Sequence, residues 1–253
     1  MSYAIRIFTH AISMVFRDLS ATVRATSAGI LLIALGAGLL VVMAPGLASG
    51  VTTFNSPEAF NSIPNIEFVL PAFLLMAIGY MMMIAAWHRY VLLPPERRDE
   101  GFTPSAGIVL GYFGRSLLLG LAVGVLAIPI FIPVGLIAAS MGDRVAEIAL
   151  IPMVALLGWL LLRWSLILPA CTIERKMSFG DSWRATKPLA GTILGVLIIF
   201  VLIDFVLNLV LGAIITDSVI SGIISVIVSL LYALVSASIL TTLYGIAVEG
   251  RDV

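Results

Sequence analysis

The stretch AGTILGVLIIFVLIDFVLNLVLGAI, residues 190–214, contains a single charged side chain, that of Asp204. A helix needs about 20 consecutive apolar residues to cross the ~30 Å hydrocarbon core of a bilayer. This stretch is long enough, and apolar enough, to predict a membrane-spanning helix.

Similar apolar runs recur along the whole chain of 253 residues, of which 61% are hydrophobic and only 11% are charged. In soluble domains roughly a quarter of the residues are charged. The sequence therefore predicts an all-α, polytopic membrane protein, and no stretch is polar enough for a separate soluble domain. The six expected spans are 27–48, 68–90, 115–139, 146–170, 190–214 and 219–246.

The basic residues lie almost entirely on one side of these spans. All but one of the 14 Lys and Arg residues fall before span 1, between spans 2 and 3, between spans 4 and 5, after span 6, or at the adjacent helix ends. The exception is Arg144, on the opposite side. Because cytoplasmic loops carry an excess of Lys and Arg, we expect both termini in the cytoplasm and the protein in the bacterial inner membrane.

Several functional classes are disfavoured by composition. The formal net charge is zero, which does not favour a nucleic-acid partner. The single cysteine, Cys171, and the two histidines, His10 and His88, are too few for a Cys- or His-based metal centre. No common nucleotide-binding or hydrolase motif is present, so we expect no enzyme activity, metal or cofactor.

A weak repeat suggests three helical hairpins. The segments VRATSAGILL (23–32), GRSLLLGLAV (114–123) and WRATKPLAGT (183–192) each place an arginine just before an outward-going span. We therefore predict hairpin units over 1–93, 94–173 and 174–253 within one membrane domain.

Each hairpin is expected to follow a helix lying on the cytoplasmic membrane surface. In the segment before the first span, apolar residues at helical spacing lie on the face opposite the basic residues, as in interfacial helices. The second opens at Thr103-Pro104, a plausible N-cap and first-turn proline. The third opens at Ser178-x-x-Asp181, a capping pattern, and places Phe179 and Trp183 on one face. The apolar residues of the first segment are Phe8, Ile12, Val15, Phe16, Leu19 and Val23.

Three polar residues form a candidate intramembrane site. Asp204 and Asn208 are four residues apart and share one helix face. An Asp in mid-membrane costs on the order of 3 kcal/mol, so it needs a partner or a water-filled cavity, for packing or for a proton or ion path. Arg163 could reach toward Asp204, but we expect it to extend to the cytoplasmic headgroups.

The segment between spans 4 and 5 carries a family resemblance. Arg163-x-x-Leu166-x-x-Pro169, Glu174 and Ser182-Trp183-Arg184-x-Thr186 resemble a recurrent pattern of bacterial inner-membrane proteins. These are similar to the membrane domain fused to glycerophosphoryl diester phosphodiesterase. The resemblance implies a membrane module and no hydrolase activity, because the hydrolase of the fused relatives is a separate soluble domain.

The leading hypothesis is a non-enzymatic protein that binds or moves lipid or another amphipathic small molecule, with membrane phospholipid as its partner. One alternative is a structural or regulatory protein that docks a protein partner through its cytoplasmic helices. Another is an ion-coupled transporter that uses Asp204. The candidate headgroup- or partner-binding residues are Arg24, Arg115, Arg175, Lys176, Trp183, Arg184 and Lys187.

Overall fold

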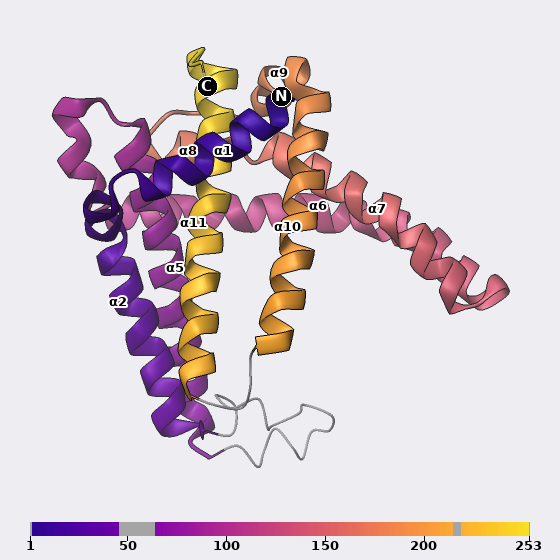
Figure 1. Cartoon of the computed structure of the whole chain (residues 1–253), viewed down its shortest axis with the longest axis horizontal. Coiled ribbons are helices and arrows are strands. Elements are labelled where there is room, and N and C mark those ends of the chain that lie inside the picture. The colour runs from indigo at the N-terminus through magenta and orange to yellow at the C-terminus, as the bar shows by residue number, and fades with distance from the viewer. Residues whose placement is uncertain (1, 46–63, 215–218, 253) are drawn as a thin grey trace. The chain divides into compact units, whose positions relative to one another are not determined.

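A computed structural model describes residues 2–45, 64–214 and 219–252, which form helices and no strands (Figure 1). Residues 46–63, most of the connection between the first two expected spans, lie outside this part of the chain. The elements are α1 (Tyr3–Phe16), α2 (Leu19–Met43), η1 (Ile66–Phe68), α5 (Val69–Leu92), η2 (Pro95–Gly101), α6 (Ala106–Met141), α7 (Asp143–Trp164), α8 (Ile167–Thr172), α9 (Phe179–Ala185), η3 (Lys187–Leu189), α10 (Ala190–Ile214) and α11 (Val219–Glu249).

Six helical segments of the described chain are long and apolar enough to cross a membrane, which confirms the all-helical prediction and is compatible with a multi-pass membrane protein. Their outer surfaces are strongly apolar: Val42 is 72% exposed, Ile148 69% and Leu110 67%. Soluble monomers rarely expose contiguous apolar surface on this scale, whereas a bilayer would cover it. The segments are Leu19–Met43, Ile66–Leu92, Ala106–Met141, Ile148–Thr172, Lys187–Gly212 and Ile224–Glu249.

The predicted starts of the first and third spans were wrong. In both cases the helix already includes residues that were expected to form a separate segment before the span. The helix predicted from residue 27 begins at Leu19, after a turn at Arg17 and Asp18. The third span and its expected surface helix form one element, α6, which begins at Ala106 and continues through Pro129 and Pro133. The Ser105 hydroxyl, rather than Thr103, lies at its N-terminus and accepts a hydrogen bond from the Ile108 backbone N–H.

Residues 19–109 form one compact unit, in which α2 and α5 lie side by side (Figure 1). The contact face uses small residues, which let the two backbones approach closely. A Cβ atom added at Gly29 would lie 2.5 Å from the Gly79 carbonyl oxygen, and one added at Gly36 would lie 2.6 Å from that of Ala72. Glycine at these two α2 positions is therefore a steric requirement of the helix pair.

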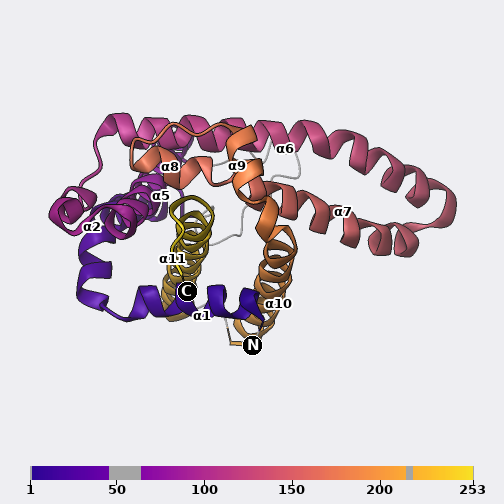
Figure 2. The ribbon, with the colours of Figure 1, turned by 90° about the horizontal axis from the view of Figure 1, so that it is seen from above.

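Residues 1–18 and 110–253 form the other compact unit, in which α1 crosses both α10 and α11 (Figure 2). The α1 face that packs there is apolar. A Cβ atom added at Gly195 in α10 would lie 3.0 Å from the methyl group of Ala4. The buried residues of α1 are Ala4, Ile7, Phe8, Ala11 and Val15.

The apolar face predicted for α1 is divided in the structure. Phe8 and Val15 are buried, whereas Ile12 and Phe16 remain exposed. One part of the predicted face therefore packs within its own unit, and the other stays available to lipid. Whether α1 lies on a membrane surface, and whether the chain is organised as three hairpins over 1–93, 94–173 and 174–253, stay predictions.

Candidate functional site: the junction between α7 and α10

The predicted fourth span is interrupted just before the junction. α7 ends at Trp164, where the Ser165 hydroxyl donates a hydrogen bond to the Leu162 carbonyl oxygen, and the short helix α8 follows. After α8, Glu174 adopts a left-handed backbone conformation with φ of 61°. The chain thus turns twice within a few residues, which brings α9 back toward the end of α7.

The predicted capping pattern of α9 is confirmed. The Asp181 backbone N–H donates to the Ser178 hydroxyl at 3.1 Å, and the Ser178 backbone N–H donates to the Asp181 carboxylate at 2.9 Å. These reciprocal bonds satisfy backbone groups that a short helix leaves open at its N-terminus. The hydrogen bonds from Ser178 also lower the pKa of the Asp181 carboxyl below its usual value, because they favour the charged form.

Arg163, in the last turn of α7, is the buried centre of the junction and is only 3% exposed. Its Nε donates to the Thr186 hydroxyl at 3.2 Å, and its Nη2 donates to the Trp183 carbonyl oxygen at 2.9 Å. The Ser182 hydroxyl donates to the Arg163 carbonyl oxygen at 2.6 Å. Arg163 therefore joins α7 to α9 at both its backbone and its side chain.

The expected orientation of Arg163 was wrong. Its side chain is buried against α9 rather than extended toward headgroups, and it makes no ion pair with Asp204 in the described part of the chain. The reason is that α9 folds back onto α7 and offers two oxygen acceptors and an aromatic surface. Sequence spacing could not show this return of the chain.

Tryptophan rings enclose the guanidinium group of Arg163. Its Cζ lies 3.3 Å from the centroid of the Trp183 ring and 4.8 Å from that of Trp159. Such cation–π contacts contribute about 2 kcal/mol when they are desolvated. Trp159 also donates from Nε1 to the Ala190 carbonyl oxygen at 2.8 Å, which joins α7 to the start of α10.

The aromatic face predicted for α9 packs inward, onto α7. Phe179 and Trp183 lie 5.7 Å and 6.3 Å, between ring centroids, from Trp164. Trp183 is thus a packing residue of the junction as well as a candidate headgroup contact. Its role at a lipid surface stays a prediction.

Four predicted cationic residues, which form the cationic rim, lie in the segment between α8 and α10. They are Arg175, Lys176, Arg184 and Lys187, and all four are exposed. Arg184 forms an ion pair with Asp181 at 2.5 Å, but its side chain remains 75% exposed. Arg175 lies beside the Tyr244 hydroxyl of α11. The structure thus combines a buried arginine, a tryptophan cluster and an exposed cationic rim.

The remaining two predicted headgroup residues lie elsewhere. Arg115 of α6 is half-buried and donates to the Gly111 carbonyl oxygen of its own helix at 3.2 Å. Arg24 belongs to the unit of residues 19–109, where its Cζ lies 5.6 Å above the ring of Phe102. Phe102 in turn stacks on Tyr90, and Arg98 lies above Tyr90, so a column of two rings between two cations joins α2, α5 and η2.

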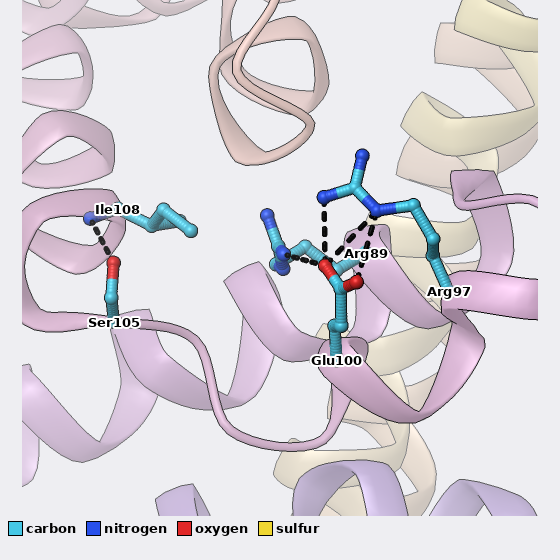
Figure 3. Close-up of polar contacts among 5 residues, drawn as sticks. All are labelled: Arg89, Arg97, Glu100, Ser105 and Ile108. Carbon is cyan, nitrogen blue, oxygen red and sulfur yellow. Dashed lines mark hydrogen bonds and ion pairs between the residues drawn. The ribbon is translucent and has the colours of Figure 1, made fainter.

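Sequence reasoning missed a second polar cluster, at the end of α5 (Figure 3). Arg97 binds the Glu100 carboxylate through Nε and Nη2, the latter at 2.7 Å, and the Arg89 guanidinium lies 3.7 Å from the same carboxylate. The hydrogen bonds from Arg97 lower the pKa of the Glu100 carboxyl. The i,i+3 spacing of Arg97 and Glu100 was an available signal, but the approach of Arg89 needs the folded η2 segment.

Asp204 and Asn208 lie one turn apart in α10, which agrees with the predicted shared face. Asn208 donates through its side-chain amide to the Asp204 backbone carbonyl oxygen at 2.8 Å, within α10. The Asp204 carboxylate is half-buried and lies close enough to the Tyr232 hydroxyl of α11 to interact with it electrostatically. A transport role for Asp204 stays a prediction.

Comparisons with protein-family models, with curated proteins and with solved structures found no match. Among the residues that the structure describes, no three His, Cys, Asp or Glu side chains are grouped so that they could hold a metal ion. The junction thus links α7 to α9 and to the start of α10, and the segment that forms it carries four exposed cations.

Proposed function

We propose that the protein is a non-enzymatic, multi-pass protein of the bacterial inner membrane that binds or moves anionic lipid, with both termini cytoplasmic. The observation that carries this proposal is that the four exposed cations of the rim share the segment between α8 and α10 with Trp183, whose ring packs on Arg163 of α7. Tryptophan is enriched at the membrane interface, and each Lys or Arg near an anionic surface contributes about 1 kcal/mol of attraction.

The arrangement favours lipid headgroups over a soluble anion because cations and indole rings occur together. Headgroups carry the phosphate that attracts Arg and Lys, and the glycerol and upper acyl region accommodates indole rings. The exposed apolar strip of α1, with Ile12 and Phe16, supports the same assignment, since a lipid surface would cover it.

The test is lipid retention by the full chain purified in a mild neutral detergent. We expect native mass spectrometry to detect bound phosphatidylglycerol. The combined substitutions Arg175→Gln, Lys176→Gln, Arg184→Gln and Lys187→Gln should reduce its retention several-fold. A matched variant that exchanges each Arg for Lys and each Lys for Arg keeps the charge and should retain lipid. Equal retention by the neutral and charge-preserving variants would reject the proposal.

The proposed sidedness has its own test. Cys171 is a native free cysteine, so a Cys171→Ser background ensures that only the new cysteines are labelled. Lys176→Cys should react with a membrane-impermeant thiol reagent only in inverted vesicles. Asn55→Cys should react only in intact spheroplasts. Labelling of both positions from one side would contradict the arrangement.

A second function is favoured by the η2 segment. Residues 94–100 are exposed and carry both acidic and basic side chains, and Phe102 stacking on Tyr90 holds the segment against α5. Mixed charge on an ordered segment suits a complementary protein surface better than an anionic leaflet. A photocrosslinker at Asp99 should then capture one cytoplasmic protein, whereas one at Met177 should capture lipid. Lipid alone captured from Asp99 would reject docking.

A further inference from the structure

Arg163 is a buried cation whose charge is not balanced by an acidic side chain in the described part of the chain. The carboxylate of α9, Asp181, is bound to Ser178 and Arg184 instead. Isolated buried charges are costly unless hydrogen bonds or a counter-charge stabilise them. The rings of Trp159 and Trp183 offset part of that cost but bring no negative charge.

The hydrogen-bonding capacity of Arg163 is only partly used. A guanidinium group has five N–H donors in one plane. Nε donates to Thr186 and Nη2 donates to the Trp183 carbonyl oxygen, while no described residue accepts from Nη1. The two indole rings lie against the guanidinium group. An acceptor for Nη1 would therefore approach in the plane of the guanidinium group, along its outer edge, which is the edge that carries Nη1.

Planar guanidinium donors match the oxygen atoms of phosphate and carboxylate groups. Arg163 lies in the last turn of α7, within a segment apolar enough to cross a membrane, and the four exposed cations of the rim follow it in the sequence before α10. At that position the abundant anion is the phosphodiester of a lipid headgroup. The rim would raise the local concentration of anionic lipid, and the buried arginine would select one molecule.

We propose that the outer edge of Arg163 binds the phosphodiester of a single anionic lipid. This inference rests on the proposed lipid-binding function. It assigns the attraction of lipid to the rim cations and the tight binding of one lipid to Arg163. Rim cations attract many lipids through screened, salt-sensitive forces. Arg163 holds one lipid in a dehydrated setting that resists salt, since buried interactions are screened much less.

The experiment measures binding of phosphatidylglycerol to the delipidated full chain in neutral detergent, at low salt and at high salt. We expect one lipid to survive high salt. Arg163→Lys keeps the charge but lacks the planar donors, and should weaken that lipid by about tenfold, equivalent to about 1.4 kcal/mol. Thr186→Val is the matched control, because it removes the partner of Nε and leaves Nη1 unchanged. It should change the affinity less than threefold.

Three results would overturn the proposal. One is a wild-type chain that keeps no lipid at high salt, a readout that does not depend on how any variant folds. Another is an equal loss of lipid in Arg163→Lys and Thr186→Val, which would show a purely structural role. The third is displacement of the lipid by millimolar inorganic phosphate, which would assign the edge to a free anion.

The neutral rim variant separates this inference from the proposed function. If it loses the salt-sensitive lipids but keeps one salt-resistant lipid, both proposals are supported. If only the salt-resistant lipid is seen in the wild type, the rim proposal fails while the Arg163 site stands. If the neutral rim variant loses the salt-sensitive lipids and the wild type holds no salt-resistant lipid, the rim proposal stands and the Arg163 proposal fails.

Discussion

The α2–α5 pair and the junction of α7 with α9 are held together by opposite means. In the first, glycine allows backbone atoms of two long helices into contact, and the fit along their apolar length is one of shape. In the second, a short helix is bound by one buried arginine, hydroxyl groups and tryptophan rings. Small-residue packing tolerates no added volume, whereas a polar and aromatic junction depends on particular donors and rings.

The largest expected effect is at the glycine contact. Gly29→Ala should destabilise the protein by about 3 kcal/mol, because the new methyl group would meet backbone atoms of α5 that cannot move aside alone. Thermal unfolding in detergent measures it. The matched control is Gly38→Ala in the same helix, since a Cβ there meets nothing within 4 Å. Similar melting of the two variants would mean that close backbone approach does not hold this pair.

The junction should respond most to loss of its arginine. Arg163→Met removes two hydrogen bonds and two cation–π contacts, and should lower the free energy of unfolding by about 2 kcal/mol. Denaturant unfolding followed by tryptophan fluorescence reports it. Arg184→Met, which removes only an exposed ion pair, should cost at most about 0.5 kcal/mol. Equal costs would place the stability of the junction outside Arg163.

The cap of α9 should contribute less. Ser178→Ala removes the hydroxyl that accepts from the Asp181 N–H, and should destabilise α9 by about 1 kcal/mol. Faster hydrogen exchange confined to the α9 amides is the expected readout. Ser140→Ala is a suitable control, because that hydroxyl only donates to carbonyl oxygens of its own helix. Unchanged α9 exchange in Ser178→Ala would show that docking onto α7 suffices.

The smallest expected effect is that of acid on the same cap. The pKa of Asp181 is lower in the folded chain than its ordinary value of 3.8, so its ionised form stabilises α9. That stabilisation is complete above pH 3.8 and declines as the pH falls through the lower folded pKa. The protection factors of the α9 amides, which correct for the pH dependence of intrinsic exchange, should therefore fall below about pH 4, and less so in Asp181→Asn. An identical acid response in both would assign the effect to other groups.

Local signals in the sequence were enough for the features that depend on neighbouring residues. The six apolar segments follow from run length, and the limits of α10 agree with the prediction at residues 190–214. The capping box of Ser178 and Asp181 was predicted from three-residue spacing, because both partners belong to one turn of helix. The predicted starts of two spans were wrong, because the apolar run begins later in the sequence than the helix itself. These helices begin at Leu19 and Ala106.

Only the tertiary structure decided which faces these helices use. Gly29 and Gly38 both follow Ala and precede an aliphatic residue, but an added Cβ would meet α5 at Gly29 and nothing within 4 Å at Gly38. Likewise, the sequence determined that Arg163 sits near the end of an apolar helix, but whether it reaches outward or inward depended on the return of α9. The physical reason is that helix formation is set by contacts a few residues apart, whereas the burial of a side chain is set by segments that are distant in the chain.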